Sequence, residues 1–257
     1  MPEIPDIHVF ASNLKKIFVG RNLSQIKVVN GKKLKNTEKE LNMHLKGKIL
    51  KDIYRCGKEL RWLFSNGDIL GMHLMLTGDA MIFKKLNSHE FTIVELYFSG
   101  NISCALTDMM RNANVTLNPT NTEGIDALDK KLNFKSLKEI LNRKTNIKNV
   151  LRNQALIRGI GNAYSDEILW KSGISPFSIA NTIPDLKIKE LARNIKTVLK
   201  KAILQISKVQ NETYGEVKEF LQIHSSKKQF SPTGAAIKFE KRGSFKTYYT
   251  DEQKLYN

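Results

Sequence analysis

The spacing of apolar residues changes along this chain, and that change constrains the fold more than any other feature. Residues 5–19 carry apolar side chains at helical spacing, which predicts an amphipathic helix near the start. From about residue 23 to residue 118 the pattern becomes short apolar runs, separated by turn residues such as Asn66-Gly67. These runs predict an antiparallel sandwich or barrel, with strands at 49–54, 60–64, 69–76, 91–98 and 102–106.

Helical spacing returns in the second half of the chain, from about residue 126 to residue 223. It predicts helices at 136–142, 146–152, 163–172 and 184–207. The last residues again read as strands, at 236–239 and 245–250, around a turn. We therefore expect an α+β multidomain fold: an N-terminal helix plus antiparallel β-sandwich in 1–122, a helical domain in 123–228 and a C-terminal β-hairpin in 229–257.

The net charge of the chain is strongly positive. Its 42 Lys and Arg residues exceed its 25 Asp and Glu residues, which gives a formal charge of +17. Because the basic residues are spread through the chain, they predict a basic folded surface rather than a basic tail. A polyanionic partner follows, and nucleic acid is favoured over a membrane. The alternative is a charge that serves only solubility.

Cysteine and histidine usage argues against a metal site. Cys56 and Cys104 are the only cysteines, and the five histidines show no ligand spacing. Few cysteines fit a reducing compartment, and we find neither a signal-peptide core nor an apolar run of about 18 residues. We therefore expect an intracellular protein without a membrane segment, in the cytoplasm or nucleoid of a bacterium or the nucleus of a eukaryote.

The chain opens Met1-Pro2-Glu3, and these residues could take part in catalysis. Removal of Met1 would leave Pro2 with a free secondary amine, a nucleophile whose ordinary pKa is about 8 for an α-amino group. The positive end of the following helix would help to keep that amine neutral, and Glu3 could move protons beside it. Such a pair can form a Schiff base. In isolation, the same residues could simply start a helix.

A second motif, Arg158-Gly159-Ile160-Gly161-Asn162, precedes a predicted helix. Two glycines before a helix can expose backbone N–H groups to a phosphate, and the Asn162 amide can donate to the same group. An ordinary turn between two helices is the alternative interpretation.

Taken together, the motifs resemble the formamidopyrimidine-DNA glycosylase/endonuclease VIII family. Met-Pro-Glu, 57–60 (GKEL), 73–78 (HLMLTG) and 161–167 (GNAYSDE) occur in the family's order and span essentially the whole chain. The resemblance implies a β-sandwich, a helix–two-turn–helix domain and a β-hairpin finger. It also implies a DNA glycosylase and AP lyase of base excision repair that needs no cofactor, acts as a monomer and binds damaged double-stranded DNA.

The resemblance assigns roles to individual residues. Pro2 is implied as the nucleophile and Glu3 as the acid/base, while Lys58 and Asn162, with Gly161, bind phosphates near the extruded nucleotide. Leu76, or the adjacent Met75, is implied as a wedge that fills the gap in the duplex, and Arg111 as the residue that faces the orphaned base. The alternatives for Lys58 and Asn162 are a solvated strand residue and a helix cap.

Three departures from the family pattern bear on function. The sequence at Met109-Met110-Arg111 lacks the family's aromatic wedge, and the finger lacks the family's four zinc-binding cysteines. We therefore expect a metal-free hairpin held by packing of residues such as Phe239, Tyr248 and Tyr249. Phe245 aligns with the family's finger arginine, so Lys246 or Arg242 is expected to supply that phosphate contact.

The third departure is the short connection from Gly215 to Gly234, which leaves little chain for the lid that covers an everted oxidised guanine. Oxidised pyrimidines or abasic sites are therefore favoured over 8-oxoguanine as substrates. Two functions remain open at this point: a glycosylase/lyase that uses Pro2, and a damage- or structure-specific DNA-binding protein with little or no glycosylase activity.

Overall fold

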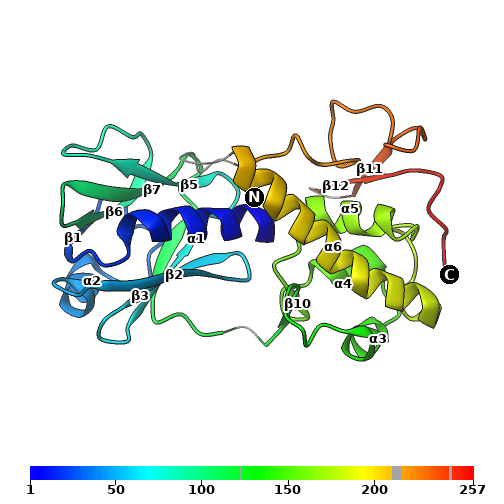
Figure 1. Cartoon of the computed structure of the whole chain (residues 1–257), viewed down its shortest axis with the longest axis horizontal. Coiled ribbons are helices and arrows are strands. Elements are labelled where there is room, and N and C mark those ends of the chain that lie inside the picture. The colour runs from blue at the N-terminus through cyan, green and yellow to red at the C-terminus, as the bar shows by residue number, and fades with distance from the viewer. Residues whose placement is uncertain (122, 210–215, 243–244) are drawn as a thin grey trace. The chain divides into compact units, whose positions relative to one another are not determined.

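The computed structural model describes residues 1–121, 123–209, 216–242 and 245–257, without the side chain of Arg242 (Figure 1). The chain forms two compact units. The first comprises Met1–Asn121 with Ile206–Glu216, and the second comprises Thr122–Gln205 with Val217–Asn257.

Two antiparallel four-stranded sheets form the first unit. One sheet has the order β1 (Leu23–Val28), β6 (Thr92–Phe98), β7 (Ile102–Asp108) and β5 (Gly78–Phe83). The other has the order β2 (Leu50–Cys56), β3 (Glu59–Phe64), β4 (Ile69–His73) and β8 (Asn114–Leu117). Helix α1 (Ile4–Phe18) packs against β2 and β3, and the short helix α2 (Glu38–Leu45) packs against β1 (Figure 1).

The core of this unit explains why the first helix forms where it does. The apolar face of α1 is fully buried through Ile7, Phe10 and Leu14, so most of its stability comes from packing. Below it, the Trp62 ring stacks on that of Phe98 with centroids 6.0 Å apart. The anchored helix fixes the position of the residues that precede it.

The second unit is mainly helical. It contains α3 (Phe134–Leu141), α4 (Ile147–Arg152), α5 (Asn162–Lys171), the 3₁₀ turn η1 (Ala180–Thr182) and most of α6 (Asp185–Val209). The two-residue strands β9 (Ile125–Asp126) and β10 (Ile157–Arg158) pair in parallel. The hairpin of β11 (Lys238–Arg242) and β12 (Phe245–Tyr249) completes the unit; its tip, Gly243-Ser244, lies outside the described residues.

The sequence predicted the types and order of the main elements correctly, and the α+β fold class is confirmed. The strand predicted at 69–76 ends at His73, because Met75 takes a left-handed backbone with φ 55° and the chain turns there. Helix α2 was not predicted. Only Leu41 and Leu45 of its residues are buried, which is too short an apolar pattern to detect, although a capping box between Thr37 and Glu40 marks its start.

Candidate active site and nucleic-acid interface

The start of the chain is buried against the first unit. Pro2 and Glu3 are both buried, with Glu3 at the N-cap of α1. The Glu3 N–H donates to the Asp6 carboxylate at 3.0 Å, which fixes the entry of the chain into the helix. In the full-length chain Met1 precedes Pro2, so the Pro2 nitrogen is an amide, and the Met1 amino group pairs with the Glu216 carboxylate at 3.2 Å.

An acidic environment surrounds this amino terminus. The pKa of Asp79, on β5, is raised to about 6. Burial is the largest cause, the nearby carboxylates Glu216 and Asp108 act in the same direction, and the terminal amine opposes them. A carboxyl group with a pKa near neutrality can exchange protons at physiological pH. Asp79 is therefore a titratable group near the chain terminus that the sequence motifs did not identify.

Lys58 lies in the two-residue turn between β2 and β3. Gly57, the first residue of that turn, has φ 59°, a conformation that favours glycine. Glu59 pairs with His73 across β3 and β4. Burial lowers the pKa of His73, and the charge of the neighbouring Lys58 lowers it further. His73 in turn accepts the Met75 N–H at its Nδ1, at 3.1 Å, and so links this turn to the loop after β4.

Two loops of the first unit present apolar side chains to solvent. Leu76, after β4, is 50% exposed, while Met109 and Met110, after β7, are 65% and 48% exposed. Met75 and Arg111 both have left-handed backbones, with φ of 55° and 53°. Exposed apolar side chains that gather in a patch mark candidate binding sites, whereas single ones are common on protein surfaces.

A buried carboxylate joins these two loops. Asp108 accepts the backbone N–H groups of Met110, Asn112 and Ala113 at 3.1, 2.6 and 2.7 Å, and it also accepts the Thr77 hydroxyl. Burial opposes ionisation, but the hydrogen bonds from Thr77 and the backbone prevail and lower the pKa of Asp108. Both loops are therefore held by one ionised side chain.

In the second unit, the glycine motif forms the turn before α5. Gly159 has φ 99°, and Gly161 is the N-cap of the helix that Asn162 begins. The Gln154 side chain holds the turn, since it accepts the Gly159 N–H and donates to the Ile160 carbonyl, each at 2.8 Å. The Asn162 amide donates to the Lys246 carbonyl at 2.9 Å. The structure thus brings together two residues that the sequence assigned to DNA binding, Asn162 on the helix and Lys246 on the hairpin.

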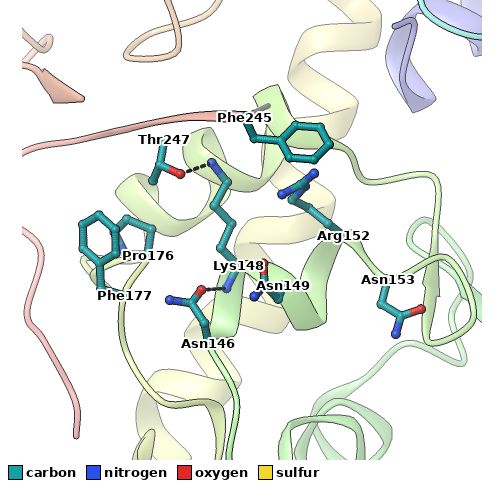
Figure 2. Close-up of a pocket in the computed structure, with 9 residues that line it drawn as sticks. All are labelled: Asn146, Lys148, Asn149, Arg152, Asn153, Pro176, Phe177, Phe245 and Thr247. Atoms are coloured by element: carbon teal, nitrogen blue, oxygen red, sulfur yellow. Dashed lines mark hydrogen bonds between the residues drawn. The ribbon is translucent and has the colours of Figure 1, made fainter. Parts of the chain in front are cut away.

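The hairpin side chains point in different directions. The Lys246 ammonium lies over the exposed Phe239 ring, 5.2 Å from its centroid. The neighbouring Phe245 ring instead lies against the guanidinium of Arg152, the last residue of α4, with 3.8 Å between the guanidinium carbon and the ring centroid (Figure 2). The side chain of Arg242, the other predicted phosphate ligand, lies outside the described residues.

Comparison with known proteins connects these features. The family model for the formamidopyrimidine-DNA glycosylase N-terminal domain matches residues 1–115, and that for its H2TH domain matches residues 124–213. The formamidopyrimidine-DNA glycosylase of Wolbachia pipientis subsp. Culex pipiens is 33% identical over 217 residues, which cover 79% of this chain and 78% of the relative. That of Mycoplasma pneumoniae is 30% identical over 271 residues, covering 95% and 97%.

The chain belongs to the formamidopyrimidine-DNA glycosylase family. The predicted family resemblance is confirmed. In fold, the chain is similar to the Lactococcus lactis Fpg in complex with DNA containing an abasic site, with a TM-score of 0.87, 22% identity and coverage of 96% and 97% of the two chains. A complex of LlFpg with THF-DNA and an inhibitor gives a TM-score of 0.89 at 23% identity, with coverage of 98% and 100%.

In this member of the family, a buried polar network ties the hairpin to the helices. Lys148 on α4 forms an ion pair with Asp166 on α5 at 2.6 Å and donates to the Thr247 hydroxyl at 2.8 Å. Asp166 also accepts the Tyr248 N–H at 2.9 Å and contacts His224 Nδ1 at 2.7 Å. The sequence predicted a hairpin held by packing of residues such as Phe239, Tyr248 and Tyr249. The rings do pack, Phe239 against Tyr248 and Tyr249 against Phe177, but the charged network is the part it missed.

Glu167, the next residue, fixes the segment that leads to the hairpin. Its carboxylate accepts the N–H groups of Gln222, Ile223 and His224 at 2.8–2.9 Å. The adjacent acids Asp166 and Glu167 of the 161–167 motif were the sequence signal for this role, because two neighbouring acids on a buried helix need partners.

Neither a metal centre nor a membrane helix is found in the part of the chain that the structure describes. Within it, no group of three or more His, Cys, Asp or Glu side chains is arranged to hold a metal ion. Among the same residues, no helix combines the length and apolar character needed to cross a bilayer.

Proposed function

We propose that this protein is a bifunctional DNA glycosylase and AP lyase whose nucleophile is the amine of Pro2. Family membership supports a DNA glycosylase of base excision repair. The observation that carries the finer proposal is the Met1-Pro2-Glu3 start, with Pro2 and Glu3 buried at the head of the anchored helix α1. A nucleophile on a rigid, buried chain end loses little entropy when it meets its target atom.

The chemistry requires removal of Met1, which turns the Pro2 nitrogen into a secondary amine. The extruded damaged nucleotide presents its C1′ to that amine. Attack of the Pro2 nitrogen forms the N–C1′ bond while the bond from C1′ to the damaged base breaks. The N–H proton of the attacking amine passes to the departing base, which leaves as its protonated form. Glu3 protonates the sugar ring oxygen as the ring opens, which yields an iminium between Pro2 and C1′.

The iminium acts as an electron sink for strand cleavage. Loss of a C2′ proton to a carboxylate allows β-elimination of the 3′ phosphate, and a second proton loss allows δ-elimination of the 5′ phosphate. Hydrolysis of the iminium then restores the Pro2 amine. Each elimination transfers one sugar proton to a carboxylate. Glu3 can accept that proton, and Asp79, whose pKa is about 6, can serve as a second acceptor.

DNA binding in this proposal uses residues of both units. Lys58 and Asn162, with Gly161, bind backbone phosphates beside the extruded nucleotide. Leu76 and Met75 fill the gap in the base stack, and Arg111 faces the unpaired base. Exposure of Leu76 on a loop held by Asp108 supports the wedge role, and the charge of +17 supports a backbone-binding surface. Lys246, or Arg242, adds a hairpin contact.

We further propose that oxidised pyrimidines and abasic sites are preferred over 8-oxoguanine. Glu167 binds the N–H groups of residues 222–224, so only residues 210–221 connect the end of α6 at Val209 to a fixed point. This length leaves little chain to form a lid over a large everted purine. Cleavage of matched duplexes containing thymine glycol, dihydrouracil, 8-oxoguanine or an abasic site ranks the substrates, and a strong preference for 8-oxoguanine opposite cytosine would overturn the proposal.

The nucleophile is tested by borohydride trapping on an abasic duplex. One protein is prepared in two forms, with Met1 removed and with Met1 retained through inhibition of the aminopeptidase, and intact mass confirms each form. We expect a covalent adduct only with the processed form, located on the N-terminal proteolytic peptide. An adduct of equal yield on the unprocessed form would assign the nucleophile to a lysine instead.

One observation favours the second candidate function, a DNA-binding protein without base excision. Phe245 occupies the position at which family resemblance predicts the finger arginine. The same trapping experiment separates the candidates. Processed protein that binds abasic DNA tightly but forms no adduct is a damage-binding protein.

A further inference from the structure

A pocket of about 480 Å³ lies between α4 and the start of β12, entirely within the second unit (Figure 2). Its charged lining residues are Arg152 and Lys148, and its other polar lining residues are asparagines and Thr247. No carboxylate lines it among the described residues. A pocket lined by cations and amide groups, without acidic side chains, is suited to an anion.

The two basic side chains of the pocket have different neighbours among the described residues. Lys148 is 4% exposed and its charge is balanced by Asp166, at 2.6 Å. Arg152 ends α4, where it is half-buried, and its guanidinium carbon lies 3.8 Å from the centroid of the Phe245 ring (Figure 2). Stacking uses the face of a guanidinium, whereas a phosphate binds to its edge through two parallel N–H groups. The ring therefore orients Arg152 without competing for an anion.

The position of the pocket indicates which anion binds. Phe245 directly precedes Lys246, whose carbonyl holds the Asn162 amide at the start of α5. The pocket thus adjoins, through one hairpin residue, the turn to which the proposed function assigns a backbone phosphate. The Phe245 side chain is 45% exposed beside the Arg152 guanidinium, so a DNA strand can approach both from the solvent side. A phosphodiester of the DNA backbone is the anion that these neighbours favour.

We propose that this pocket binds one backbone phosphate of the damaged duplex, with Arg152 as the ligand and Phe245 as the platform that orients it. The proposal rests on the proposed function, because it requires DNA on this face of the second unit. It also accounts for a phenylalanine at the hairpin position where an arginine was expected: the guanidinium is supplied by α4 and lies on the ring.

The test compares DNA affinity across a salt series for the full-length, processed protein and its variants, on a duplex with a tetrahydrofuran abasic analogue. Arg152→Ala is expected to weaken binding roughly tenfold and to reduce the slope of log affinity against log salt by about 1. Phe245→Leu keeps the charge, so its slope is unchanged, while affinity falls about two- to fivefold as the platform is lost. Arg152→Lys keeps the slope but not the paired N–H geometry.

A matched control is available in the same unit. The Lys189 ammonium lies 5.1 Å from the Phe134 ring centroid, outside the pocket. Lys189→Ala is expected to leave the salt slope unchanged. An equal loss of slope in this control would show that Arg152 contributes only general charge, and would overturn the proposal.

A second measurement locates the phosphate and does not depend on the stability of one variant. Single methylphosphonate substitutions, which neutralise one phosphate at a time, are scanned along the duplex. We expect one position where neutralisation weakens wild-type binding but has no further effect on Arg152→Ala. If every position affects wild type and variants equally, the pocket holds no backbone phosphate.

Two further arms separate the remaining outcomes. Inorganic phosphate that binds wild type but not Arg152→Ala, with DNA affinity unchanged between them, would identify a small-anion site and overturn the DNA assignment. Trapping on abasic DNA is measured in parallel. If the wild type is trapped and Arg152→Ala binds DNA as tightly as the wild type, this inference is refuted while the proposed function stands. If the wild type neither binds nor is trapped on abasic DNA, the proposed function is refuted.

Discussion

Replacement of Lys148 by methionine is expected to destabilise the second unit strongly. The Lys148 and Asp166 side chains are 4% and 0% exposed and lie 2.6 Å apart. Loss of the cation leaves the Asp166 charge buried beside the Tyr248 N–H and His224. Removal of one partner from a buried ion pair costs about 3–5 kcal/mol. At about 2–4 °C per kcal/mol for a chain of this size, the midpoint of thermal unfolding should fall by about 6–20 °C.

The chain contains a matched control for this effect. Lys138 and Asp185 form an ion pair of nearly the same length, 2.7 Å, between α3 and α6, but both side chains are 53% exposed. Lys138→Met should therefore cost about 0–1 kcal/mol. Calorimetry or circular dichroism during thermal unfolding measures both variants under identical buffer conditions.

A double replacement tests the electrostatic cause directly. Lys148→Met combined with Asp166→Asn removes the uncompensated charge while the amide oxygen can still accept the Tyr248 N–H. We expect the double variant to be more stable than Lys148→Met alone, because the coupling between neighbours in one network is large. Additive losses, or a cost for Lys148→Met no greater than that for Lys138→Met, would refute the argument that this buried pair holds the hairpin.

Three other perturbations concern the first unit. The pKa of Asp79 is raised from 3.8 to about 6 in the folded state, so the folded state loses stability as pH rises between those values. Asp79→Asn should therefore raise the unfolding temperature at pH 7.5 but not at pH 4. Thermal unfolding scans at both pH values measure this difference. Asp108→Ala leaves the N–H groups of Asn112 and Ala113, in the loop after β7, without their acceptor. This should cost about 1–3 kcal/mol in chemical denaturation and weaken binding to abasic DNA. Gly78→Ala would place a methyl group against the Leu74 carbonyl oxygen and 2.9 Å from the Ala113 Cβ; a lower denaturation midpoint is expected, and an unchanged midpoint would mean that this strand start can shift.

Local sequence patterns were sufficient for much of the fold and for part of the candidate site. Apolar spacing placed α1 and α6 within a few residues of their ends, because each helix buries one continuous face. Glycines marked the Gly57 turn and the turn before Asn162, where φ reaches 59° at Gly57 and 99° at Gly159. The roles of Pro2, Glu3 and the wedge residues stay predictions, since no observed contact with DNA assigns them.

Other features depend on contacts between distant segments, and no local pattern encodes them. The strand predicted through residue 76 was too long, because the Asp108 carboxylate holds the adjoining loop from another sheet. The pKa of Asp79 likewise depends on Glu216, a residue from far along the sequence that packs beside the chain terminus.

The sequence by itself determined the kinds of element, their order and the glycine turn before α5, because spacing and turn chemistry act over a few residues. The tertiary structure alone decided that Lys148 neutralises Asp166 and that Arg152 lies on Phe245. Each pair joins a helix to another element that the chain reaches only after several turns, so its formation depends on which faces pack together. Burial then gives the Lys148–Asp166 pair its energetic weight, because a charge removed from water must find its partner within the fold.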